Sequence, residues 1–146
     1  MNYEACMRLS LALLVGVTFA GCDIPVPEPK TFAEINDQVI QKSCAKFSSC
    51  HSPLGYKSAG NMNLQVDPYN QLVNIPATNV RALAENQIRV VPGSLEQSFL
   101  WTKLNLQTAT DPKVDYGEPM PNKSGYLPAP QLEGIRKWIL RGAPND

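Results

Sequence analysis

The residues best suited to chemistry in this sequence are two cysteines, one histidine and one methionine. Cys50 is followed directly by His51, the only histidine in the chain, and Cys44 lies six positions before Cys50. Met120 lies 69 positions beyond His51, between two prolines. Thiolate, imidazole and thioether groups are ligands of transition metals. The spacing therefore indicates a cofactor or metal site, with a disulfide between the two cysteines as the simpler alternative in an oxidising compartment.

The order of Cys44, Cys50 and His51 resembles the attachment motif of c-type haem. In that motif the thiols add to the vinyl groups of the macrocycle, and the imidazole binds iron from one face. Met120 is the expected ligand on the other face, because the flanking prolines stiffen the backbone that aims its thioether. A His/Met pair raises the reduction potential of haem iron, which suits electron transfer. We therefore expect one covalent haem c bound by Cys44, Cys50, His51 and Met120, with His51 and Met120 as iron ligands.

From about Gln38 to the C-terminus the chain resembles the class I cytochrome c family, and most closely a variety found in exported bacterial lipoproteins. Four pieces carry the resemblance, in the family's order: CAKFSSCHSP (44–53), RVVPGSLEQSFLWTKL (89–104), Met120-Pro121 and LEGIRKWILRGA (132–143). The resemblance implies a small, mainly α-helical domain around a haem, attached through Cys44, Cys50 and His51 with Met120 as the distal ligand. It also implies that the last helix packs against the first.

The separation of the two cysteines differs from the family's usual two intervening residues. Five residues, 45–49, lie between Cys44 and Cys50. A bulge at Ser48-Ser49 would bring both thiols back within reach of one haem. The same spacing leaves open a disulfide, and with it a haem-free exported binding module.

Other kinds of site fit the residues less well. A blue-copper site requires two histidines, and zinc held by the two cysteines and His51 requires a fourth ligand. A serine nucleophile would have no histidine base other than His51, and the chain has no glycine-rich phosphate loop. Met62 is the rival for the distal position, but it lacks the Met-Pro context. The sequence thus predicts no catalytic residues, and a protein that is not an enzyme.

The N-terminus has the features of an export signal. A mostly apolar run over residues 9–20 follows Arg8 and is shorter than the roughly 20 residues that span a bilayer. Phe19-Ala20-Gly21-Cys22 resembles the lipobox of bacterial lipoproteins, which implies cleavage before Cys22 and a lipid on its thiol. Ordinary cleavage with a spare thiol at Cys22, or an uncleaved anchor, are the alternatives. We expect a signal peptide over 1–21, lipidated Cys22 with a Pro-rich spacer over 22–30, and a periplasmic or cell-envelope location at a membrane.

Capping signals and apolar spacing predict four helices in a domain over residues 31–146. A polar loop over 107–117 and an extended segment over 88–93 are expected between them. No internal repeat and no long alternating strand pattern occurs. The four helices are expected to start at the Thr31/Glu34 capping box, at Asp67 as cap before Pro68, at the Ser94/Gln97 capping box and near Pro130. The first helix should run to Cys44, and Gly142 should end the last.

Composition limits the size of the core and the class of partner. The chain has 146 residues, 13 prolines and 9 glycines, which predicts one small domain with many turns. Small domains often depend on a cofactor or staple for stability. Lys and Arg number 13, as do Asp and Glu, so we expect no nucleic-acid partner. The expected haem implies instead a redox protein as the partner.

Overall fold

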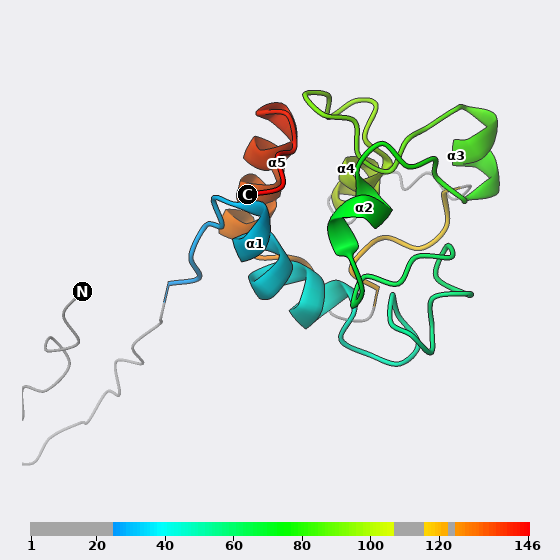
Figure 1. Cartoon of the computed structure of the whole chain (residues 1–146), viewed down its shortest axis with the longest axis horizontal. Helices are drawn as coiled ribbons and strands as arrows, with labels where there is room; N and C mark the ends of the chain where they lie inside the picture. The colour runs from blue at the N-terminus through cyan, green and yellow to red at the C-terminus, as the bar shows by residue number, and fades with distance from the viewer. Residues whose placement is uncertain (1–24, 107–115, 123–124) are drawn as a thin grey trace, which may run out of the picture.

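The protein is mainly helical. The computed structural model of the chain describes residues 25–106, 116–122 and 125–146. Within these ranges it has no β-strand, and loops connect short helices (Figure 1). The predicted signal peptide, Cys22 and most of the predicted polar loop lie outside the described residues. The helices are α1 (Phe32–Ile35), the π-helix η2 (Asn36–Cys44), α2 (Pro68–Leu72), α3 (Val80–Ala84), α4 (Phe99–Asn105) and α5 (Ala129–Leu140).

The first helix begins at the predicted cap. The Thr31 hydroxyl accepts a hydrogen bond from the Glu34 backbone N–H over 3.1 Å. The Glu34 carboxylate does not close the usual reciprocal bond to the cap residue; it accepts from the N–H of Lys30, one residue earlier, over 2.6 Å. The capping box therefore extends into the segment before the helix.

The chain continues from α1 without a break into η2, which ends at Cys44 as expected. The wider winding was not predicted. Two contacts five residues apart reflect it: the Gln41 amide donates to the Asn36 side chain over 2.9 Å, and the Ala45 N–H donates to the Ile40 carbonyl over 2.8 Å. π-Helical turns are rare and occur frequently at functional sites.

Helix α2 begins where predicted, with Asp67 before it and Pro68 in its first turn, but the Asp67 side chain does not cap it. The Asp67 carboxylate accepts from the Asn70 side chain, and only its backbone carbonyl accepts from a helix N–H, that of Gln71 over 3.3 Å. Helix α3 was not predicted. Its signal is Asn79, whose side chain accepts from the Ala82 N–H over 3.0 Å. A short helix of this kind depends on its cap more than on periodicity.

The Ser94/Gln97 capping box closes a turn and does not start a helix. The Ser94 hydroxyl accepts from the Gln97 N–H over 3.3 Å, yet α4 begins only at Phe99. Ser98 is the residue before α4, and its buried hydroxyl accepts from the Val91 N–H over 2.9 Å. The predicted extended segment is therefore tied to the start of α4.

That extended segment forms isolated bridges and no sheet. Val90 pairs with Val73 in parallel, and Ile88 pairs with both Pro76 and Ser98. Gly93, with a φ of 84°, takes the left-handed conformation in the turn that follows. The prediction of an extended segment ending in a turn is confirmed.

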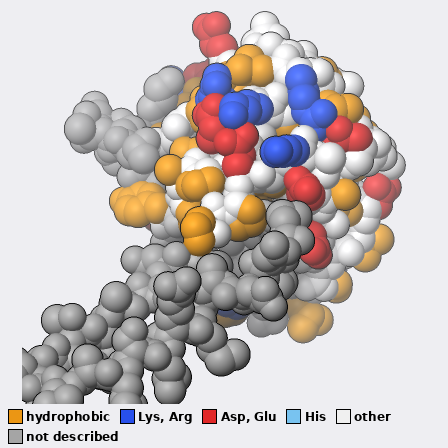
Figure 2. All heavy atoms as spheres, turned by 90° about the vertical axis from the view of Figure 1, so that its left-hand side faces the viewer, with side chains coloured by type: hydrophobic (Ala, Val, Ile, Leu, Met, Phe, Trp, Pro, Cys, Tyr) orange, Lys and Arg blue, Asp and Glu red, His pale blue; other side chains and the backbone are white. Residues whose placement is uncertain are grey.

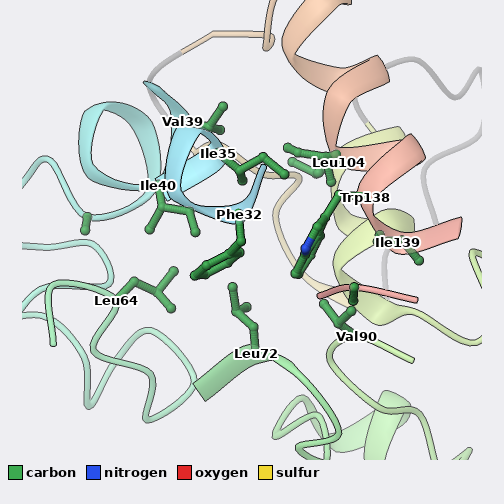
Figure 3. Close-up of a cluster of buried hydrophobic side chains, with 13 residues drawn as sticks. Phe32, Ile35, Val39, Ile40, Leu64, Leu72, Val90, Leu104, Trp138 and Ile139 are labelled. Carbon is green, nitrogen blue, oxygen red and sulfur yellow. The ribbon is translucent and has the colours of Figure 1, made fainter. Parts of the chain in front are cut away.

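The hydrophobic core lies between the first and last helices and the segments beneath them. Helix α1 packs against α5, as the sequence led us to expect. Phe32 and Trp138 face one another with ring centroids 5.2 Å apart, and Leu72 approaches the same rings (Figure 3). Tyr69 meets the Phe32 ring edge-on at 5.1 Å. Ring pairs in these geometries add stability beyond their buried area.

The end of the Pro-rich segment belongs to the domain. Pro29 is fully buried, and a Cβ built at Gly134 of α5 would lie 2.5 Å from the Pro29 carbonyl oxygen. Glu28 forms an ion pair with Lys137 at 2.8 Å. The last residues of the expected spacer over 22–30 therefore lie against α5.

The surface over the first and last helices carries interleaved charges. Basic and acidic side chains lie next to one another on the face seen in Figure 2. Arg136 pairs with Glu133 at 2.7 Å, and Arg141 pairs with Asp146 at 2.8 Å. Exposed pairs of this type contribute little to stability, because water and salt screen them. Across the described ranges, no helix has both the length and the apolar character needed to cross a bilayer.

Candidate functional site

Cys44, Cys50, His51 and Met120 all line one cavity. Its volume is about 550 Å³, within the range of about 300–1,000 Å³ typical of small-molecule and cofactor pockets. Apolar side chains from η2, α4 and α5 form much of the wall, and Trp138 is among them. Four residues that span 77 positions of sequence, from Cys44 to Met120, are thus brought to one place.

A tight loop returns the chain from Cys44 to Cys50. Helix η2 ends at Cys44, and the His51 N–H donates to the Cys44 carbonyl over 3.2 Å. Inside the loop the Cys50 N–H donates to the Phe47 carbonyl over 3.0 Å, and Ser48-Ser49 form a turn. The intervening residues are looped out at the predicted position.

Gly55 holds that loop in place and was missed by the sequence analysis. A Cβ built on Gly55 would lie 2.3 Å from the Cys50 carbonyl oxygen and 2.5 Å from that of Ser48. Both neighbours are backbone atoms, so no side chain fits without moving the loop. A glycine four positions after the histidine is the only sequence signal for this contact, and it is a weak one.

The two cysteines are free thiols in the structure. Burial, and after it the charge of the Cys50 thiolate, raise the pKa of the Cys44 thiol to about 12. At neutral pH the Cys44 side chain is therefore a neutral thiol, which reacts slowly unless a partner activates it.

His51 is buried, and its ring is oriented by backbone. Its Nδ1 atom lies 3.3 Å from the Met62 carbonyl oxygen. Burial lowers the pKa of His51, and the positive charges of Arg89 and Lys103 lower it too, while the carbonyls of Met62 and Ala59 oppose the shift. The imidazole is therefore neutral at pH 7, which is the form that binds metals.

Met120 is fixed to α4. Its backbone N–H donates to the Lys103 carbonyl over 3.1 Å. The rival, Met62, lines the same cavity, but its carbonyl lies beside the ring of His51. Met62 thus belongs to the segment that supports the imidazole, whereas Met120 reaches the cavity from the segment between α4 and α5.

Two buried cations on the cavity wall were not singled out from the sequence. Arg89 and Lys103 are each only 9% exposed, and both line the cavity. They lie in the longest of the four cytochrome-like pieces, but nothing in their spacing marks them as site residues. Only the tertiary structure brings them together beside His51.

Within the described ranges, no group of three or more His, Cys, Asp and Glu side chains is arranged to hold a metal ion. Iron in a porphyrin requires no such group, because the macrocycle provides the equatorial nitrogens and the protein only axial ligands. Comparison of the chain with models of protein families, with characterised proteins and with solved structures gives no match. Function is therefore inferred from the residues and the cavity of this chain alone.

Proposed function

We propose that this protein is an electron carrier with one covalently bound haem c, exported and anchored to a membrane through a lipid on Cys22. The observation that supports the proposal most strongly is the shared cavity of Cys44, Cys50, His51 and Met120. Its size and apolar lining suit a planar, mostly apolar cofactor. The four residue types are the attachment thiols and the axial ligands that such a cofactor requires.

Each residue has a defined role in the proposal. Cys44 and Cys50 would hold the haem, each by adding its S–H across a vinyl group to form a thioether. His51 would bind iron through Nε2, with Nδ1–H donating to the Met62 carbonyl, a bond that would fix the tautomer and make the ligand more basic. Met120, whose backbone is held by α4, would be the second iron ligand. The haem iron supplies the one-electron couple.

The apolar walls around the ligands set the surroundings of that couple. Ile35, Ile40 and Leu104 are buried in the core and line the cavity. Apolar walls disfavour extra charge at the iron and so, together with the thioether ligand, would favour the reduced state. The proposal assigns no catalytic residue and no substrate.

The position of the packed domain bears on its partner. Glu28, which pairs with Lys137 of α5, lies six positions after Cys22, and an extended chain covers at most about 3.6 Å per residue. The domain would therefore stay within about 20 Å of the lipid. We propose a redox partner at the same membrane surface, in the periplasm or cell envelope.

The test is to express the full chain together with haem-attachment machinery and record a pyridine haemochrome spectrum. We expect a c-type spectrum, and a proteolytic peptide covering residues 44–51 whose mass includes haem. The matched variants Cys44→Ala and Cys50→Ala should each leave one unreacted vinyl group and a shifted haemochrome band. A folded, colourless wild-type protein would exclude the proposal.

A second candidate, a haem-free binding module with a Cys44–Cys50 disulfide, is favoured by the position of both cysteines on the wall of one cavity, at the two ends of a loop closed by the bond from the His51 N–H to the Cys44 carbonyl. The same cavity would then take a different apolar ligand. Peptide mass mapping separates the two candidates, because it finds either a haem-bearing peptide or a disulfide-linked pair. Cys44→Ser would cost the disulfide module about 2–4 kcal/mol of stability.

A further inference from the structure

Arg89 points a buried guanidinium into the region of the candidate site. Its Nη1 donates to the Gln71 carbonyl over 2.7 Å, and its Nη2 donates to the Gly60 carbonyl over 2.9 Å. Its backbone is fixed as well, because the Leu100 N–H donates to the Arg89 carbonyl over 2.9 Å. The side chain is thus held rigidly, by neutral groups.

Lys103 is the second buried cation. Its Nζ donates to the Tyr116 carbonyl over 2.8 Å and to the Glu118 carbonyl. Burial lowers the pKa of Lys103, and the Glu118 carboxylate, on an exposed residue, opposes that shift from a distance. Among the described residues, no carboxylate forms an ion pair with either Lys103 or Arg89.

The two cations share one cavity, because both line its wall. Removing a charge from water without a counter-charge is costly, and carbonyl partners compensate only in part. In the part of the chain that the structure describes, no carboxylate forms an ion pair with Arg89, and Lys103 has only the Coulomb attraction of the exposed Glu118 carboxylate. An apolar cavity with these two cations on its wall is therefore suited to a ligand that carries negative charge on one edge.

We propose that Arg89 and Lys103 are anion-binding residues of this cavity and pair with the two carboxylates on one edge of the bound porphyrin. The inference rests on the proposed haem function and adds to it the residues that orient the macrocycle. A guanidinium offers a planar pair of donors to a carboxylate, and an ammonium offers a compact charge. With the carboxylate edge fixed there, the vinyl edge is left for the thiols.

The first test is the reduction potential of the covalent holoprotein. Arg89→Gln and Lys103→Met remove one positive charge each, which stabilises the ferric state and leaves a carboxylate uncompensated. We expect each variant to have a reduction potential lower by about 59 mV, which corresponds to a tenfold change in the equilibrium constant of a one-electron reduction. Arg89→Lys and Lys103→Arg should recover most of the loss. Arg136→Gln, which removes an exposed cation paired with Glu133, should leave the potential unchanged.

The second test isolates the carboxylates. Full-length protein carrying Cys44→Ala and Cys50→Ala is titrated with haem and with haem dimethyl ester. We expect the free acid to bind at least tenfold more tightly than the dimethyl ester. When Arg89→Gln and Lys103→Met are added, the two forms should bind with nearly equal affinity. Should this variant without the two attachment cysteines bind neither form, the potentials of the holoprotein decide.

The outcomes separate the inference from the proposed function. A wild-type protein that carries haem, but whose neutral variants keep both the potential and the preference for the acid, overturns the inference and leaves electron transfer intact. Equal losses in the charge-conserving and neutral variants also overturn it, because they indicate a purely steric role. A wild-type protein without haem overturns both.

Discussion

The Nδ1 atom of His51 lies 3.3 Å from the carbonyl oxygen of Met62. A carbonyl can only accept a hydrogen bond, so this contact favours the tautomer with the proton on Nδ1 and a free lone pair on Nε2. It also places the Met62 backbone on the side of the ring away from Nε2. The contact distinguishes the two methionines of the cavity. Met62 belongs to the segment that orients the His51 ring, whereas Met120 comes from the segment between α4 and α5.

The two methionines should therefore respond differently to replacement. Met120→Ala removes the thioether proposed to bind iron, so we expect a changed ligand-field spectrum and a lower reduction potential. Met62→Ala keeps the backbone carbonyl that orients His51, so the spectrum of this variant should match that of the wild type. Optical spectra and redox titration of both holoproteins provide the measurement. A spectral change in Met62→Ala alone would reverse the assignment.

Gly55→Ala should impair attachment of the cofactor. The new Cβ would meet the Cys50 and Ser48 carbonyl oxygens at 2.3 Å and 2.5 Å, so the loop must move and carry Cys50 with it. Overpacking of this kind costs about 1–3 kcal/mol. We expect a lower melting temperature and a lower haem-to-protein ratio after expression with the attachment machinery.

Gly125→Ala is the control for Gly55→Ala. Gly125 has a φ of 74° and no atom near its built Cβ, so the substitution introduces backbone strain alone, about 1–2 kcal/mol. Its haem-to-protein ratio should match that of the wild type. Equal ratios in all three proteins would show that the loop position does not govern attachment.

Gly134→Ala should destabilise the protein even though alanine is the better helix former. In an open helix position the exchange would add about 1 kcal/mol of stability. Here the Cβ would lie 2.5 Å from the Pro29 carbonyl oxygen, so we expect a net loss of about 1–3 kcal/mol. Urea denaturation gives the free energy of unfolding. The control is Leu140→Ala on the same helix: Leu140 is half-exposed, so this substitution should change the free energy of unfolding by less than about 0.5 kcal/mol. A stabilised Gly134→Ala protein would show that Pro29 is not held against α5.

The carboxylate of Asp146 should make stability depend on pH in the acid range. It accepts from the Phe32 N–H over 2.7 Å and from Arg141, and these bonds hold its pKa below the ordinary value. A depressed pKa means that the stabilisation is present above the unfolded-state pKa of about 4 and is lost as pH falls through the lower folded-state value.

The measurement is the free energy of unfolding of wild type and Asp146→Asn between pH 2 and pH 7. We expect the wild type to be more stable at neutral pH and the two proteins to converge at the acid end. A difference between wild type and Asp146→Asn that persists at pH 2 would contradict the assignment.

Local sequence determined much of the architecture. Thr31 caps the first helix through its own hydroxyl, and the chain from there to Cys44 is helical because its apolar residues recur on one face. The last helix likewise follows from the spacing of Ile135, Trp138 and Ile139, all buried. Such signals act over a few residues, and they can be read without knowing where the chain goes next.

The misplaced start of α4 shows where local reading fails. Ser94 and Gln97 form the expected hydrogen bond, yet α4 begins only at Phe99. The reason is that the Ser98 hydroxyl is hydrogen-bonded to Val91 of the extended segment. A tertiary contact therefore overrides the capping signal. The π-helical winding of η2 has no counterpart in the sequence pattern that we can identify.

The sequence by itself determined which chemical groups the candidate site contains: two thiols, one imidazole and one thioether, in a fixed order along the chain. Only the tertiary structure decided that Met62 supports the His51 ring, that Gly55 admits no side chain, and that Arg89 and Lys103 face the same cavity. These relationships join segments through backbone carbonyls and close packing. Any residue type provides a carbonyl, so no pattern of side chains along the chain could have revealed them.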